Sequence, residues 1–431
     1  MVTLIEAGPS VVDGFRITGG GGSTTDLPYS SNGGGIFVRG GAPVIRNNVI
    51  ANNDPRRPGD VSTFGGGIYS NSADIAIENN TISENIAMRG AGIAAVGGTV
   101  VISGNTVRAN VGYGDHGGGM YVGAPNATIT HNRIYENEIG RDLGYGWGGG
   151  IIIFNQGNHA DLSYNEVFSN YAPGHGAGIF VDEGATAVLR NEIVHHNMVD
   201  AGETGGGAVY VDGGEFNGVP IGSVVSIINC TIAENPVTDA YLGGNALFVE
   251  GNSTVTVRNS ILWGNGLEVW FDNTSTVQIT YSNIAESIAG AGNISQNPLF
   301  ANAAAGDFHL KSEAGRWDPA ANSGAGSFVL DAATSPCIDS GDPVDSFASE
   351  PAPNGGRINM GAYGNTPEAS LSTHGGGNPP TDLNDDAAVN AVDVQLVING
   401  ALGVGGAADV NTDGFTDAVD VQLVINAALA A

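Results

Sequence analysis

The feature that most constrains this chain is a glycine triplet followed by an apolar residue, which occurs eight times. The first copy is Gly33-Gly34-Gly35-Ile36, and later copies sometimes carry alanine or asparagine in place of one glycine. The residues that follow the triplets, here called the anchors, are Ile36, Ile68, Ile93, Met120, Ile151, Ile179, Ala208 and Ala246. Successive anchors are 25 to 38 residues apart. A repeat of this length is typical of a solenoid, in which each repeat stacks on its neighbours.

A second signature in the repeats is a short run that begins and ends with asparagine, such as Asn80-Thr81-Ile82-Ser83-Glu84-Asn85. Apolar residues alternate along these segments, which is the period of strands with one buried face. We therefore predict three short strands per repeat, each paired in parallel with its equivalent one coil further on. The result is an all-β parallel β-helix of about 9 to 10 coils, with valine and isoleucine filling its interior.

The asparagines and glycines have structural roles in such a solenoid. One set of asparagines is predicted to form a ladder in which each side-chain amide bonds to the next. This set consists of Asn48, Asn80, Asn105, Asn132, Asn165 and Asn259. The glycines supply the positive φ that a tight turn needs at every level.

Composition limits the partners of this chain. With 44 acidic and 14 basic residues, the net charge is -30, which argues against nucleic acid or an anionic membrane surface. No apolar run is long enough to insert in a membrane, and Met1 is not followed by an export signal. Because residues 11–20 already read as part of a coil, we expect an amino-terminal cap and a signal to be missing. Cys230 and Cys337 are expected to be buried apolar residues.

These repeats resemble the right-handed parallel β-helix proteins of the pectin-lyase-like superfamily, and more closely the secreted bacterial members with Gly-Gly-Gly-Ile and Asn-Asn-x-Ile repeats. The resemblance covers residues 11–300 and implies the handedness of the coil and a carbohydrate-related role. Polysaccharide lyases, hydrolases, epimerases and adhesins share this architecture, so the resemblance is specific for fold rather than for activity.

The glycine triplets also predict which side chains lie together. If the triplets are in register, the residues four before the anchors form one column with a spacing of about 4.8 Å. This column contains Asn32, Phe64, Arg89, His116, Trp147, His175, Thr204 and Leu242. Asp115 lies one position earlier, and the loop before Gly148 adds Arg141, Asp142 and Tyr145.

Such a set of side chains suits a site for a sugar acid. Phe64 and Trp147 would offer rings to the sugar, with Asp115 and Asp142 as polar contacts, and Arg89 or Arg141 would bind a carboxylate. For β-elimination, His116 would be the base, and Tyr145 or His175 would be the acid. A hydrolase would instead need two carboxyl groups, for which Asp115 and Asp142 are the candidates. The alternative is that these are ordinary solvated loop residues of a non-catalytic adhesin or scaffold.

The period is lost after Asn297-Pro298-Leu299-Phe300. We predict a β-helix over residues 1–300, and a closing segment over 301–372 that protects the open end of the solenoid. A linker rich in glycine and proline would follow over 373–381, and a separate module over 382–431.

The last module contains the sharpest motif, a duplicated loop with oxygen ligands at positions 1, 3, 5, 9 and 12. This is the pattern of an EF-hand calcium loop, in which position 7 contributes a backbone carbonyl. The predicted Ca2+ ligands are Asp382, Asn384, Asp386, Ala388, Asn390 and Asp393 in the first loop, and Asp409, Asn411, Asp413, Phe415, Asp417 and Asp420 in the second. Eight aspartates without a lysine or arginine would repel one another unless a cation were bound.

The two loops and their near-identical following segments resemble a type I dockerin over residues 382–429. The resemblance implies a helical calcium-binding module that docks onto a cohesin-like or cell-surface protein. The sequence departs from that pattern, because Ala387 replaces the glycine at position 6, and positions 10 and 11 are Ala-Val in both loops, where dockerins often carry Ser-Thr. Calcium binding is therefore better supported than docking.

Taken together, the sequence predicts a secreted or surface protein. Its β-helix would bind an acidic polysaccharide and would cleave it by β-elimination if it is an enzyme. The alternative is an adhesin or scaffold whose only ligand is calcium.

Overall fold

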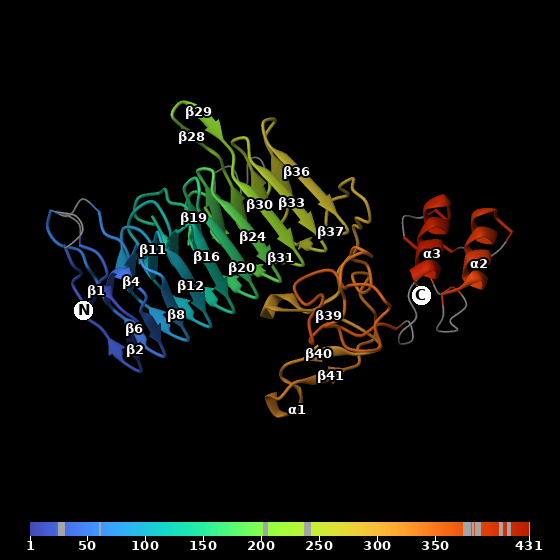
Figure 1. Ribbon diagram of the computed structural model, residues 1–431, viewed down its shortest axis with the longest axis horizontal. Coiled ribbons are helices and arrows are strands. Elements are labelled where there is room, and N and C mark those ends of the chain that lie inside the picture. Colours follow the sequence, from blue (N-terminus) through green and yellow to red (C-terminus); the bar gives the residue numbers. More distant parts are fainter. Residues whose placement is uncertain are drawn as a thin grey trace. The chain divides into compact units, whose positions relative to one another are not determined.

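The structure is a computed structural model of the 431-residue chain. It describes residues 1–24, 31–59, 62–200, 206–236, 243–373, 381, 383, 389–404, 408–411 and 415–430. These residues form two compact units, residues 1–256 with 262–278, and residues 257–261 with 279–431. The first unit is dominated by parallel strands that follow one another along a solenoid (Figure 1).

Three ten-stranded parallel sheets make up the solenoid, so each sheet receives one strand from each of ten coils, as predicted. Sheet A consists of β1 (Val2–Ala7), β4 (Ile36–Gly41), β7 (Ile68–Asn71), β11 (Ile93–Val96), β15 (Met120–Gly123), β19 (Ile151–Phe154), β23 (Ile179–Asp182), β27 (Val209–Val211), β32 (Leu247–Val249) and β35 (Val269–Phe271). Sheet B consists of β2 (Val11–Asp13), β5 (Val44–Arg46), β8 (Ile75–Glu78), β12 (Thr99–Ser103), β16 (Asn126–Thr130), β20 (His159–Ser163), β24 (Thr186–Arg190), β30 (Val224–Ile228), β33 (Thr254–Arg258) and β36 (Thr276–Thr280). Sheet C consists of β3 (Arg16–Ile17), β6 (Val49–Ala51), β9 (Thr81–Ser83), β13 (Thr106–Arg108), β17 (Arg133–Tyr135), β21 (Glu166–Phe168), β25 (Ile193–His195), β31 (Thr231–Ala233), β34 (Ile261–Trp263) and β37 (Asn283–Ile284).

These coils also contain a smaller parallel sheet and a hairpin. A fourth parallel sheet, sheet D, joins five middle coils through β10 (Ile86–Ala87), β14 (Val111–Gly112), β18 (Glu138–Ile139), β22 (Tyr171–Ala172) and β26 (Met198–Val199). An antiparallel hairpin of β28 (Gly214–Phe216) and β29 (Val219–Ile221) projects from the solenoid (Figure 1). The sequence pattern predicted neither element.

The glycine triplets set the register of sheet A. Ile36, Ile68, Ile93, Met120, Ile151 and Ile179 pair in series and are fully buried, and the glycine three residues before each has a positive φ. The last two anchors were predicted one residue too early, because Ile179 pairs with Val209, and Val209 with Leu247. The shift places the larger Val209 and Leu247, rather than Ala208 and Ala246, at the interior positions, since a slip of one residue reverses which side chains face the core.

The predicted asparagine ladder is present from Asn48 to Asn165. Asn80 Nδ2, for example, donates to Asn105 Oδ1 at 3.0 Å. Asn259 is not part of this ladder, because the residue that precedes β34 in the ladder position is Ser260. Asn259 instead donates to Asp345 Oδ2 at 2.7 Å.

The ladder also contains an acidic residue and is accompanied by a second ladder. Glu192 follows Asn165, and its Oε1 accepts from Asn165 Nδ2 at 2.8 Å. The second ladder follows the strands of sheet C and consists of Asn53, Asn85, Asn110, Asn137, Asn170, Asn197, Asn235 and Asn265. Both ladders satisfy buried backbone groups at the turns, which is why asparagine is required at nearly every level.

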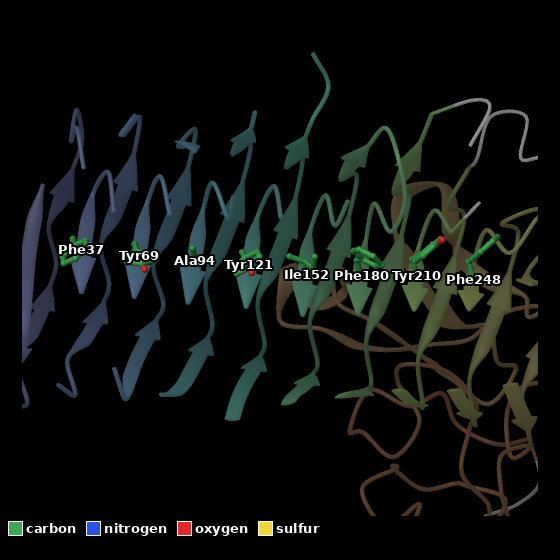
Figure 2. Packing of buried hydrophobic residues seen from close by; sticks show 8 residues of the cluster. All are labelled: Phe37, Tyr69, Ala94, Tyr121, Ile152, Phe180, Tyr210 and Phe248. Atoms are coloured by element: carbon green, nitrogen blue, oxygen red, sulfur yellow. The ribbon is translucent and has the colours of Figure 1, made fainter. Parts of the chain in front are cut away.

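Sheet A also carries a row of apolar and aromatic side chains, most of them large, on the face opposite the anchors. Figure 2 shows this row, with one residue from each of eight coils: Phe37, Tyr69, Ala94, Tyr121, Ile152, Phe180, Tyr210 and Phe248. The row is buried although it lies outside the solenoid core, because residues such as Phe64 and Trp147 pack over it. Sheet A is therefore apolar on both faces in the coils that also carry the predicted column.

The second unit contains antiparallel strands and short helices. β38 (Phe300–Asn302) pairs with β39 (Asp307–Leu310) around a 3-10 turn η1 (Ala303–Ala305), and β40 (Arg316–Asp318) pairs with β41 (Ser327–Val329) around α1 (Ala321–Gly324). Cys337 is buried here, as Cys230 is in the first unit, as predicted.

The helices α2 (Ala391–Ala401) and α3 (Ala418–Ala430) pack on a small apolar core that includes Val397, Val410 and Val424. The predicted domain borders stay predictions, and residues 374–380 of the predicted linker lie outside the described residues.

Candidate functional site

The predicted column exists in the first unit. Phe64 bridges to Arg89, and Trp147 bridges to both His116 and His175, all in parallel. Gly90 N donates to His116 O at 3.2 Å, which joins the two halves of the column. Thr204 and Leu242 lie outside the described residues, and the corrected register puts Gly243 at the last of these levels. The six residues from Asn32 to His175 therefore follow the prediction.

An ion pair joins the centre of the column to Asp115. Arg89 donates through Nε and Nη2 to the two oxygens of Asp115, both at 2.7 Å. His116 Nδ1 lies 3.0 Å from Asp115 Oδ1, an ion-pair distance, although Nδ1 makes no aligned hydrogen bond. Burial opposes ionisation of Asp115, but His116 and Arg89 outweigh it and hold the pKa of this carboxyl well below its usual range. Asp115 therefore stays ionised and cannot serve as the general acid of a hydrolase.

Aromatic rings surround His116. Its ring centroid is 5.2 Å from that of Trp147 and 5.1 Å from that of Phe154. Tyr145 lies next to Trp147, with 6.0 Å between the centroids, and is 49% exposed. The structure thus brings His116, Tyr145 and Trp147 together, with Trp147 half-buried and Tyr145 at the surface.

The other predicted site residues make different contacts. Arg141 Nε donates to Glu138 Oε2 at 2.6 Å, and its guanidinium lies 3.9 Å from the ring centroid of Tyr171 on sheet D. Asp142 is exposed in the same loop. His175 stacks on Tyr210 at 4.5 Å, and Phe64 receives the Arg89 guanidinium over its ring at 5.7 Å.

The calcium loops are described only in part. Asp382, Asn384, Asp386, Ala388 and Asp413 lie outside the described residues. Asp393 and Asp420, at position 12 of the two loops, are both fully buried. Each accepts a hydrogen bond from the backbone near the start of its loop, from Leu383 N at 2.7 Å and from Val410 N at 2.8 Å. No group of three or more His, Cys, Asp or Glu side chains suited to a metal occurs among the residues that the structure describes.

Comparison with known families agrees with this geometry. The family described as "Right handed beta helix region" matches residues 11–171 and 149–303, which together exceed half of the chain. The chain belongs to the right-handed β-helix family. Residues 380–429 of this β-helix protein match the dockerin type I domain, and residues 272–341 match the family described as "Disaggregatase related".

Neither the curated proteins nor the solved structures yield a match to the chain. Of the helices in the described part of the chain, none has both the length and the apolar character required to cross a membrane. The combination of a β-helix with a dockerin domain suggests an extracellular carbohydrate-active protein.

The β-helix also carries a row of carboxylates that the sequence reasoning missed. Asp182, Asp212, Glu250 and Asp272 directly follow residues that pair along the last four strands of sheet A. Burial and the Asp212 carboxylate raise the pKa of Asp182 to about 8, and burial and Glu250 raise that of Asp212 to about 7. Counting three residues forward from the corrected anchors would have found this row.

Proposed function

We propose that the β-helix binds a polysaccharide chain across the column face, which we define as Phe64, Arg89, Asp115, His116, Tyr145, Trp147 and His175. The proposal depends on one observation, the half-buried Trp147 ring between His116 and His175, with the exposed Tyr145 beside it. An aromatic ring offers an apolar face and a low entropic cost of ordering, both of which suit a sugar ring. The β-helix and dockerin matches support the same class of function.

Replacing Trp147 by alanine tests this proposal. We expect Trp147→Ala to weaken polysaccharide binding about tenfold, since one aromatic contact contributes on the order of 1 kcal/mol beyond the area it buries. Affinity electrophoresis against a panel of polysaccharides would measure the loss. Trp263→Ala, which removes a half-buried tryptophan from sheet C, is the matched control. Equal binding by both variants and the parent would refute the proposal.

Cleavage of an acidic polysaccharide by β-elimination is the second candidate, and the Asp115–His116 contact beside Arg89 favours it. In this reaction His116 takes the proton from the carbon next to the uronate carboxylate. The C–O bond to the leaving sugar breaks, a C=C bond forms, and Tyr145 or His175 protonates the leaving oxygen. Arg89 would have to share its donors between Asp115 and the substrate carboxylate. A rise in ultraviolet absorbance from unsaturated ends would support it, whereas no rise with any uronate polymer leaves only binding or hydrolysis. If reducing ends do not increase either, the adhesin or scaffold is favoured.

For the carboxy-terminal module we propose calcium binding and attachment to a cohesin-like or cell-surface partner, outside the cell. The duplicated, fully buried Asp393 and Asp420 fit a calcium loop, because each carboxylate is already oriented by backbone N–H groups of its own loop. Bound calcium would supply the positive charge that the acidic loops lack.

Removal of calcium should unfold this module selectively. With EDTA, we expect the helical circular dichroism signal of α2 and α3 to disappear, because metal binding is coupled to folding in small modules. The β-sheet signal should stay unchanged, since the ladders of sheets A, B and C need no metal. Asp420→Ala should weaken the effect of calcium on the helical signal, and Asp161→Ala on sheet B should not. A helical signal that ignores both calcium and EDTA would contradict the assignment.

A further inference from the structure

We infer that the column face selects uncharged polysaccharides over polyuronates. This inference rests on the proposed binding function and names the class of sugar that the same site would take. It differs from the expectation of an acidic ligand because the structure shows what the arginines contact, which the sequence did not.

Both arginines that were expected to hold a uronate carboxylate already have carboxylates of their own. Arg89 makes two 2.7 Å hydrogen bonds to Asp115, and neither side chain is more than about a third exposed. Arg141 pairs with Glu138 at 2.6 Å and lies against Tyr171. A uronate would have to displace a carboxylate that is fixed at the right distance, so it gains little from either arginine. Each pair is neutral as a whole.

The surroundings of the column face add further negative charge. Asp142 is exposed in the loop that carries Tyr145, and Glu250 and Asp272 follow strands of the same sheet A. Asp182 and Asp212, in the same row, carry only part of a negative charge near neutral pH, because burial and neighbouring carboxylates raise their pKa values to about 8 and about 7. Tyr121, on sheet A, lies near both the column face and the row of carboxylates. Burial raises the pKa of its hydroxyl, and the charges that also act on this pKa come from Arg89 and Asp115 of the column face and from Glu183 and Asp182 at the row. A polyuronate carries one negative charge per sugar and would approach a chain of net charge -30 against repulsion. An uncharged chain meets no such barrier.

The remaining surface of the face suits uncharged sugar rings. Tyr145 and Trp147 offer aromatic rings 6.0 Å apart, and the ring of His116 adjoins them. Contacts of this kind depend on apolar ring faces and hydroxyl groups rather than on charge. Discrimination then comes from the unfavourable placement of a carboxylate, which is how many sites reject a competitor.

The test compares polymers that differ only in charge. The full chain would be titrated with polygalacturonate and with the same polymer after reduction of its carboxyl groups to alcohols, and likewise with alginate and reduced alginate. Neutral glucans, galactans and mannans complete the panel. Each measurement is made at pH 8 with and without EDTA, so that calcium bridges are detected. We expect the uncharged member of a pair to bind at least about tenfold more tightly at low salt, and the gap to shrink as salt is added.

Two variants test the cause of the selectivity. Asp115→Asn frees Arg89, and Glu138→Gln independently frees Arg141, so either should improve polyuronate binding several-fold. Glu138 lies outside the column face, so Glu138→Gln should also leave neutral binding nearly unchanged. Asp161→Asn removes the same charge from sheet B and is the matched control. If one variant folds poorly, the other still tests whether the paired carboxylate causes the selectivity.

The outcomes separate the inference from the function on which it rests. The inference is overturned if the parent chain binds a polyuronate as tightly as, or more tightly than, its neutral counterpart, with or without calcium. If Trp147→Ala then loses this polyuronate binding, the proposed function remains intact. Failure of every polymer to bind would overturn both. Preference for the neutral polymer, reduced by Asp115→Asn or Glu138→Gln but not by Asp161→Asn, supports the inference.

Discussion

Replacing Asn137 by alanine should destabilise the β-helix by roughly 4 kcal/mol or more, which is a large part of the stability of an ordinary domain. Asn137 is fully buried in the second ladder. Its Oδ1 accepts from the backbone N and the Nδ2 of Asn110 at 3.1 and 2.9 Å, and its Nδ2 donates to Val107 O and Asn170 Oδ1 at 2.9 and 3.0 Å. Alanine removes four hydrogen bonds and leaves buried polar groups unpaired, with no room for bulk water to replace them.

Urea unfolding followed by far-ultraviolet circular dichroism would measure this loss. Asn126→Ala is the matched control, because Asn126 is exposed at the start of β16. We expect it to change the free energy of unfolding by less than about 0.5 kcal/mol. A loss below about 1 kcal/mol for Asn137→Ala would mean that the ladder contributes little to stability.

Replacing Glu192 by glutamine should have the opposite effect and stabilise the protein at neutral pH. Glu192 occupies a ladder position, is fully buried, and has an Oε2 atom without a hydrogen-bond partner. Burial raises the pKa of Glu192 to about 8, although hydrogen bonds from Asn165 oppose the shift. The fold therefore holds this carboxyl in its protonated form, whereas the unfolded chain releases the proton near pH 4.3.

The sign of the pH dependence follows from this difference. Because the folded pKa is raised, the contribution of Glu192 is intact below about pH 4 and is lost as the pH rises toward 8. At pH 7 the loss is on the order of 3 kcal/mol, and glutamine, which does not titrate, avoids it. Glutamine keeps an oxygen for the two hydrogen bonds that Asn165 donates.

Urea unfolding at pH 4, 7 and 9 would compare Glu192→Gln with the parent chain. The stabilisation should be near zero at pH 4 and should grow through pH 7. Glu136→Gln, at an exposed turn position, should show no such trend. A gain that is the same at every pH would rule out titration of Glu192 as the cause.

Much of the fold could be predicted because a solenoid is nearly one-dimensional. Each residue of a coil meets mainly the equivalent residues of the coils before and after it. The positions of the glycine triplets and paired asparagines in the sequence therefore predict which residues of neighbouring coils are in contact. Counting from the triplets placed Phe64, Arg89, His116, Trp147 and His175 in one column.

Counting residues from the glycine triplets gave the wrong strand register where loops of variable length separate the coils. The segments before Val209 and Leu247 allowed a slip of one residue, and burial of the larger side chain decided the register. The ladder position of Asn259 was misjudged for a related reason, since the neighbouring Ser260 precedes β34. The sequence pattern did not predict Glu192 as a member of the asparagine ladder, because a carboxyl group seldom replaces a buried amide.

The sequence by itself determined the period, the parallel strands, the asparagine ladder and the membership of the column, since these depend on contacts that repeat from coil to coil. Only the tertiary structure decided which charges neutralise each other. Arg89 pairs with Asp115 and Arg141 with Glu138, and the carboxylates after the strands of sheet A stand in a row. These contacts depend on the path of individual loops and on side-chain conformations, which no repeat specifies. They change the expected ligand of the column face from an acidic to an uncharged polysaccharide.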